Sequence, residues 1–154
     1  MNALEIRNLT KDYGEFTLDN LNLTLPCGCI MGLIGENGAG KSTTIKLILD
    51  MIHRDEGTIT LLGRDNREDM LLTKQDIGVV LDEVGIPSCL SAVQVGKIMA
   101  HTFTKWDKEL YAQYLKKLNL PEKRPFKEYS KGMKMKLAIA VALSHHPKLL
   151  ILDE

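Results

Sequence analysis

The sequence has no long hydrophobic run, no excess of one charge and few aromatic residues. Its longest apolar run, Leu137 to Leu143, is far shorter than the roughly 18 residues that a membrane-crossing helix requires. Lysine plus arginine and aspartate plus glutamate both number 20, so charge alone gives no case for nucleic acid as a partner. Glu5 and Arg7 interrupt the first residues, which argues against a signal peptide.

The sequence also lacks the cysteine content of a disulfide-stabilised protein. The three cysteines are Cys27, Cys29 and Cys89, and this odd number favours reduced thiols in a cytosolic protein. Cys27-Gly28-Cys29 resembles half of a metal site, but no second ligand pair follows it. We therefore do not expect zinc there.

The chain has enough apolar residues for a folded core. It contains 154 residues, of which 44% are hydrophobic and 26% charged. These values predict a globular protein with one domain, or most of one, rather than a disordered chain.

The segment from Gly35 to Ser42 matches the phosphate-binding pattern G-x-x-x-x-G-K-[ST], the P-loop. The apolar run Ile30–Ile34 before it predicts a buried strand, and the apolar spacing from Thr43 to Ile52 predicts a helix. Glycines let such a loop curl so that its N–H groups face phosphate oxygens. The candidate nucleotide-binding residues here are Gly35, Glu36, Asn37, Gly38, Ala39, Gly40, Lys41, Ser42 and Thr43.

Within the P-loop, two side chains have separate expected roles. Lys41 is expected to reach the β- and γ-phosphates and to act in catalysis, and the Ser42 hydroxyl to ligate Mg²⁺. A nucleotide with β- and γ-phosphates, together with Mg²⁺, is therefore the predicted ligand.

The rest of the chain alternates between strand and helix patterns. The predicted strands are Leu4–Leu9 and Phe16–Leu25, an antiparallel pair, and then 58–62, 77–81 and 149–152. Helices are predicted from Ser91, from Asp107 and from Met133 to His145, with Ser91 and Ser130 as N-caps. Tyr13 lies in the first turn, where it either faces the nucleotide or packs on the sheet edge. The basic stretch 123–136 is interpreted as a solvated face rather than a phosphate-binding patch.

Acidic residues follow two of the predicted strands. Asp82 follows the strand 77–81, and Asp153 and Glu154 follow 149–152. Ligands bind outside the carboxyl ends of parallel strands. Asp153 is a candidate Mg²⁺ ligand, and Glu154 is placed to polarise an attacking water. The helix N-terminus at Ser130 is a second predicted anion site.

With these motifs in this order, the sequence resembles the ATP-binding-cassette (ABC) transporter ATPases over essentially its whole length, in particular cassettes of bacterial exporters. The residues that carry the resemblance are Tyr13 in the adenine-stacking position, Gly35–Ser42, Tyr129–Met133 in the signature position, and Leu149–Glu154. The resemblance implies an α/β P-loop NTPase (RecA-like) core with an N-terminal antiparallel β part and a helical subdomain. It also implies that Ser130 and Gly132 contact a nucleotide held by a second cassette.

The resemblance further implies the protein's partners and location. We expect a second cassette as homo- or heterodimer partner, a separate transmembrane permease subunit, and a cytoplasmic position on the inner face of the cell membrane. The expected activity is ATP hydrolysis that energises transport, with export as its direction. We expect no nucleic-acid partner.

Three features depart from the family pattern. Lys131 and Met133 replace a glycine and a glutamine of the usual signature, and Asp82 stands where a loop glutamine usually lies, near the metal. The chain also ends at Glu154, whereas family members continue. We expect a fragment of a longer ATPase, divided at about 1–82 (β part and P-loop core), 83–145 (helical subdomain) and 146–154 (last strand), with weak or no turnover of its own.

Two alternatives remain open at this stage. One is a nucleotide-binding or dimerisation module without turnover, favoured by the altered signature. The other is a soluble ABC protein that acts on ribosomes or DNA. Tandem cassettes or long coiled coils are typical of the second alternative, and the sequence shows neither.

Overall fold

The computed structural model describes residues 1–68 and 70–153, which divide into two compact units, Met1–Thr73 and Lys74–Glu154. Among the described residues, no helix combines the length and apolar character needed to cross a bilayer.

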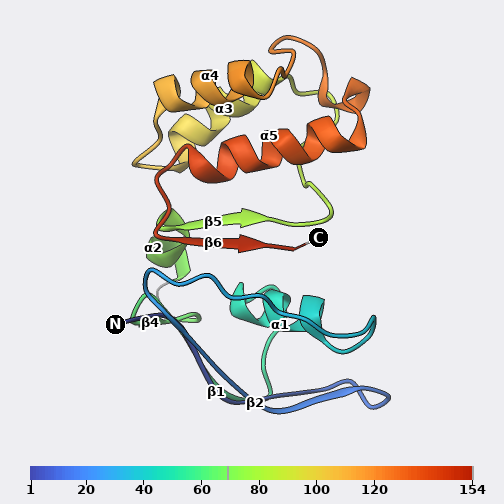
Figure 1. Ribbon diagram of the computed structural model, residues 1–154, viewed down its shortest axis with the longest axis vertical. Helices are drawn as coiled ribbons and strands as arrows, with labels where there is room; N and C mark the ends of the chain where they lie inside the picture. The colour runs from blue at the N-terminus through green and yellow to red at the C-terminus, as the bar shows by residue number, and fades with distance from the viewer. Residues whose placement is uncertain (69, 154) are drawn as a thin grey trace. The chain divides into compact units, whose positions relative to one another are not determined.

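A four-stranded antiparallel sheet forms the base of the first unit (Figure 1). The strands are β1 (Asn2–Asp12), β2 (Thr17–Pro26), β3 (Glu56–Leu61) and β4 (Arg64–Asp65), in the order β2-β1-β3-β4. Alternation of apolar and polar residues buries the paired residues Leu4 and Leu61, and Ile6 and Ile59, on one face, as a half-buried strand requires. Leu9 is also buried, beyond a register shift that follows Ile6. The predicted antiparallel pair is confirmed.

The helix that follows the P-loop, α1 (Lys41–Ile48), buries Ile45, Leu47 and Ile48. Its apolar residues recur at the helical spacing, as the sequence predicted. Asn66, beyond β4, is buried and donates its side-chain amide to the carbonyl oxygens of Leu47 (2.8 Å) and Ile48 (3.0 Å). Asn66 thus satisfies the Ile48 oxygen, an acceptor that a helix end leaves open, and shares the Leu47 oxygen with the Asp50 N–H (3.1 Å).

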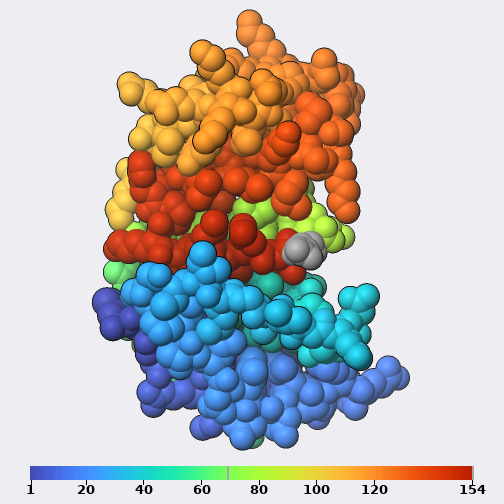
Figure 2. Space-filling view, in the orientation of Figure 1, coloured from blue at the N-terminus to red at the C-terminus, as the bar shows by residue number. Residues whose placement is uncertain are grey.

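The predicted strand at Ile30–Ile34 is wrong. These residues adopt no strand, and Ile30 and Ile34 are fully exposed; in Figure 2 the sky-blue part of the chain that includes them lies on the visible surface. An apolar run becomes a strand only when a neighbour pairs with its N–H and C=O groups. None of the strands in the described ranges pairs with this run.

The second unit places helices on a two-stranded parallel sheet (Figure 1). After the short helix α2 (Met70–Gln75), which spans the division, come β5 (Ile77–Val80), α3 (Ala92–Thr102), α4 (Lys108–Lys117), the 3-10 turn η1 (Phe126–Glu128), α5 (Lys131–Leu143) and β6 (Leu149–Leu152). Ser91, Asp107 and Ser130 each accept a main-chain N–H at the start of a helix. The predicted starts of these helices are confirmed, except that α5 begins two residues earlier than Met133.

The core of this unit lies between α3, α4 and α5. Tyr111, Leu115, Phe126 and Leu137 are among its buried members, and Trp106 packs against them. Ala138 and Ala142 on α5 pack on Val80 of β5. These contacts fix α5 over the parallel sheet.

β6 forms as predicted and is partly buried. Leu149 is buried, whereas Leu150 and Leu152 are exposed. Side chains along a strand alternate between the two faces of a sheet, so the exposed Leu150 and Leu152 lie on the same face. Among the described strands, β6 pairs only with β5.

Candidate nucleotide-binding site

The P-loop is an exposed turn that ends at the N-terminus of α1. Gly38 (φ 86°) and Gly40 (φ 94°) adopt the left-handed conformation that side chains with a Cβ disfavour. Lys41 donates its Nζ to the carbonyl oxygens of Gly35 (2.7 Å) and Glu36 (2.8 Å). The lysine ammonium therefore lies over the loop, where phosphates are expected to bind.

Gly40 is also held by a close contact. A Cβ placed on Gly40 would lie 2.9 Å from Cζ of Phe16, much closer than packing allows. Phe16, at the turn between β1 and β2, therefore supports the end of the P-loop. From the sequence, Phe16 was predicted only as part of a strand. Alternation along a strand does not reveal that its side chain contacts the P-loop.

Tyr13 lies in the same β1–β2 turn, and its main-chain N–H donates to the Phe16 carbonyl oxygen (2.9 Å). Half of the Tyr13 side chain is exposed (50%), and the Lys11 ammonium lies 5.5 Å from the centre of its ring. The contact between Phe16 and Gly40 connects this turn to the P-loop. Tyr13 is thus an accessible aromatic ring on a turn that packs on the P-loop.

An ion pair fixes the base of this turn. Lys11 donates to Oδ1 of Asp55 (2.8 Å), and the main-chain N–H of Asp12 donates to Oδ2 (2.8 Å). These hydrogen bonds lower the pKa of Asp55 below its ordinary value, and the bond from Lys11 is the largest cause. Asp55 therefore remains ionised at neutral pH and ties the start of β3 to the end of β1.

In the second unit, two candidate metal ligands lie at the same edge of the parallel sheet. Val80 pairs with Leu152, and the main-chain N–H of Asp153 donates to the Val80 carbonyl oxygen (2.8 Å). Asp153 and Asp82 therefore both follow the carboxyl ends of paired strands, as the sequence predicted. Two carboxylates at such an edge suit Mg²⁺, which prefers oxygen ligands. The described residues hold no group of three or more metal-binding side chains.

The N-terminus of α5 lies beside this edge. Ser130 Oγ accepts the N–H of Met133 (3.2 Å), so Ser130 is the N-cap, and Gly132 lies in the first turn. Lys131 Nζ is 4.0 Å from Oδ1 of Asp82, with both side chains well exposed; such a pair contributes little to stability. It does show that the signature segment and the Asp82 loop are neighbours.

The predicted site residues fall into two groups. Tyr13 and the P-loop belong to the first unit, while Asp82, Ser130, Gly132 and Asp153 belong to the second. Glu154, the candidate catalytic carboxylate, lies outside the described residues. The expected solvated face is confirmed for the exposed Lys123, Arg124, Lys127, Lys131 and Lys136, while Lys134 covers the Phe126 ring at 5.2 Å.

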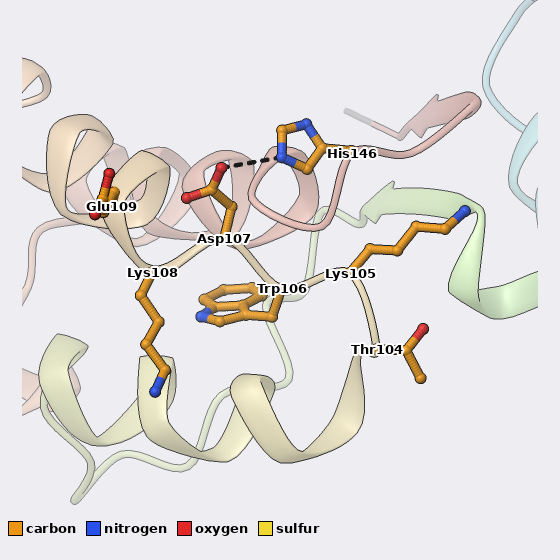
Figure 3. Close-up of a pocket in the computed structure, with 7 residues that line it drawn as sticks. All are labelled: Thr104, Lys105, Trp106, Asp107, Lys108, Glu109 and His146. Atoms are coloured by element: carbon orange, nitrogen blue, oxygen red, sulfur yellow. Dashed lines mark hydrogen bonds and ion pairs between the residues drawn. The ribbon is translucent and has the colours of Figure 1, made fainter.

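A separate pocket in the second unit is lined by residues 104–109 and His146 (Figure 3). Asp107 Oδ2 accepts from Nε2 of His146 (3.1 Å), and Asp107 Oδ1 accepts the Leu110 N–H (2.9 Å). The bond from Leu110 is the main cause that lowers the pKa of Asp107. Its carboxylate is thus engaged in fixing the start of α4. The nearby His145 is buried, with Nε2 3.0 Å from the Ile77 carbonyl oxygen.

The exposed glycine loop before α1 and the two acids at the carboxyl edge of a parallel sheet define the class of protein: an α/β P-loop protein. Comparison with known proteins gives the family. The family model described as "ABC transporter" matches residues 18–154. The chain belongs to this family.

The relatives are ATP-binding proteins. The chain is 40% identical to the bacitracin transport ATP-binding protein BcrA of Enterococcus faecalis, covering 99% of this chain and 50% of that protein. It is 39% identical to the lantibiotic transport ATP-binding protein SrtF of Streptococcus pyogenes, covering 98% of this chain and 66% of that protein. The chain thus spans about half to two-thirds of the length of these relatives.

A solved structure of an ATP-binding subunit of an ABC transporter has the same fold. It superimposes with a TM-score of 0.87 at 26% identity, covering 99% of this chain and 66% of that one. The expected α/β cassette fold is confirmed.

Proposed function

We propose that the protein binds ATP with Mg²⁺ and that the whole protein hydrolyses ATP to energise export by an ABC transporter. The observation that supports this proposal most directly is the P-loop, in which Gly38 and Gly40 adopt left-handed conformations and Lys41 lies over the loop. Export is supported by relatives named for bacitracin and lantibiotic transport and for daunorubicin/doxorubicin resistance.

In this proposal, each residue acts on a particular part of the nucleotide. The N–H groups from Gly35 to Thr43 and the positive end of α1 hold the phosphates, and Lys41 exchanges its two carbonyl acceptors for phosphate oxygens. The exposed ring of Tyr13 stacks on the adenine. Ser42, Asp153 and Asp82 would hold Mg²⁺, which would supply charge neutralisation at the phosphates. Glu154 orients the attacking water.

The proposed partners are a second cassette and a transmembrane permease subunit. Ser130 and Gly132 at the N-terminus of α5 would contact the nucleotide bound by the other cassette, because a helix N-terminus attracts anions. Such a protein would work at the cytoplasmic face of the membrane. The three-part division at about residues 82 and 145 belongs to the same proposal.

The test is binding of a fluorescent ATP analogue to the purified chain and to two variants with lysines replaced on the same helix. Lys41→Ala should weaken binding by about tenfold or more, because a charge-assisted contact to phosphate is lost. Lys46→Ala is the control, since Lys46 is exposed on α1 and has no proposed contact with the nucleotide. Equal affinities for the two variants would contradict the proposal.

A second candidate is a nucleotide-dependent dimerisation module without turnover. It is favoured by Lys131 and Met133 in the signature position, where the positive charge of Lys131 lies beside Asp82. Phosphate release by the whole protein distinguishes the two functions. ATP-dependent association without phosphate release would favour this second function.

A further inference from the structure

The turn after β2 holds two cysteines that the nucleotide site does not use. The Cys29 N–H donates to the Pro26 carbonyl oxygen (3.4 Å), which closes a four-residue turn from Pro26 to Cys29. Gly28 is its third residue, with φ of 78°, the conformation that a type II turn demands. The Cys27 N–H donates to the Met1 carbonyl oxygen (3.1 Å), which anchors the turn to the start of β1.

Both thiols are free and exposed, so reagents in solution reach them directly. Two Cα atoms two residues apart are separated by at most about 7 Å, and disulfides join Cα atoms about 4.4–6.8 Å apart. A turn shortens the separation further. The chain following the turn is exposed and outside any strand, so a small adjustment breaks no ladder hydrogen bond.

The local chemistry favours a disulfide over a metal. Structural zinc requires four ligands, whereas the described residues contain no group of three or more histidines, cysteines or acids that could hold a metal. Two thiols by themselves are sufficient for one disulfide.

We propose that Cys27 and Cys29 form a thiol–disulfide exchange site that is oxidised by small-molecule disulfides. One cysteine thiolate attacks a sulfur of the small disulfide, whose S–S bond breaks and releases one thiol. The second thiolate then attacks the protein sulfur of the mixed disulfide and releases the second thiol. Two electrons pass from the cysteines to the small disulfide, and the two protons end on the released thiols.

The small ring makes this site reversible. A disulfide across only one intervening residue is strained, and strained, exposed disulfides have more oxidising potentials than structural ones. The site therefore responds to the ratio of disulfide to thiol around it.

The experiment uses the chain with Cys89→Ser, which leaves only the two turn cysteines. It is incubated in buffers with increasing ratios of oxidised to reduced glutathione, alkylated and weighed by mass spectrometry. The expected product is a monomer lighter by about 2 Da, the loss of two hydrogens on disulfide closure, that takes up no alkylating reagent. Cys27→Ser and Cys29→Ser in the same background should each stop at one glutathione adduct.

A further variant tests the geometry of the turn. Gly28→Ala places a Cβ at a positive φ, although nothing lies within 4 Å of that Cβ, so its effect acts through the backbone. The closed form should require a several-fold higher glutathione disulfide ratio than in the parent. If the Cys89→Ser chain instead accumulates two glutathione adducts, forms intermolecular dimers or stays reduced throughout, the proposal is overturned.

Discussion

Asn66 donates its buried side-chain amide to the carbonyl oxygen of Leu47, 2.8 Å away, and thereby connects the turn after β4 to the last residues of the P-loop helix. Arg54 completes the arrangement, since it donates to Oδ1 of Asn66 and pairs with Asp65 (3.0 Å). One buried amide thus acts both as donor, to α1, and as acceptor, from Arg54.

Replacement of Asn66 should therefore destabilise the first unit. Asn66→Ala removes the side-chain donor to the Ile48 oxygen and one of two donors to the Leu47 oxygen, which also accepts the Asp50 N–H (3.1 Å). The expected cost is about 1–3 kcal/mol in the free energy of unfolding. Asn66→Asp retains the acceptor for Arg54 but loses the donor, so it should also destabilise. Urea denaturation measures the stability of both variants. Gln113→Ala is the control, because Gln113 is exposed. A neutral effect of Asn66→Ala would contradict the assigned role.

Gly40→Ala should impair both folding and nucleotide binding. It places a Cβ at φ 94° and against the Phe16 ring, so the loop or the ring has to move. We expect a loss of at least about 1 kcal/mol of stability and weaker binding of a fluorescent ATP analogue. Gly85→Ala is the matched control, because its Cβ meets nothing within 4 Å at an ordinary φ.

Replacing the N-cap serines of α3 and α5 can distinguish an effect on stability from an effect on function. Ser130→Ala and Ser91→Ala should each cost about 1 kcal/mol of stability, because each serine accepts an N–H at a helix start. If Ser130 also contacts the nucleotide of a second cassette, only Ser130→Ala should reduce ATP-dependent self-association. Analytical ultracentrifugation with and without ATP measures this. An equal reduction in both variants would reject the specific role of Ser130.

Loss of the Asp153 carboxylate should raise the Mg²⁺ concentration that ATP binding requires. Asp153→Asn keeps the size of the side chain but removes its charge, and about a tenfold higher Mg²⁺ concentration should be needed, as for the loss of an outer metal contact. Glu83→Gln is the control, because Glu83 is exposed in the loop after β5. The measurement is a Mg²⁺ titration with the fluorescent analogue, and a curve equal to that of the parent would exclude Asp153 from the metal site.

Asp76 should contribute to stability in a pH-dependent way. Lys105 (2.7 Å) and Lys148 (3.2 Å) both donate to its carboxylate, and the hydrogen bond from Lys105 is the main cause that lowers the pKa of Asp76. Because the pKa is lower in the folded than in the unfolded state, this stabilisation is complete above the unfolded pKa of about 3.9. It is lost as the pH falls through the folded value.

The test compares thermal unfolding at pH 7 and pH 3. Asp76→Asn should lose less stability than the parent between the two values, whereas the exposed substitution Asp19→Asn should behave like the parent. An unchanged pH dependence in Asp76→Asn would show that the two lysines do not act through its charge.

The elements with strong local signals could be predicted from the sequence. Ser91, Asp107 and Ser130 mark helix starts through their own side chains, and alternation marks β1 and β2. The run Ile30–Ile34 has an equally clear apolar pattern but no paired strand in the described ranges, and pairing is a non-local property that a pattern does not contain.

The supports of the site were harder to find. Asn66 lies in a polar stretch that reads as a loop, and only the fold brings its amide to the end of α1. The strand pattern around Phe16 was recognisable in the sequence, but the contact of Phe16 with Gly40 depends on the path of the turn. The motif residues were predictable because their spacing is local, whereas their supports come from distant positions.

Lys41 donates to the carbonyl oxygens of Gly35 and Glu36, and these two hydrogen bonds should make the loop selective for negatively charged ligands. A ligand that enters has to replace two good neutral acceptors of the ammonium. An uncharged nucleoside offers nothing stronger in exchange, whereas phosphate oxygens form hydrogen bonds roughly twice as strong as neutral ones. The loop should therefore discriminate against nucleosides before any contact with the base is made.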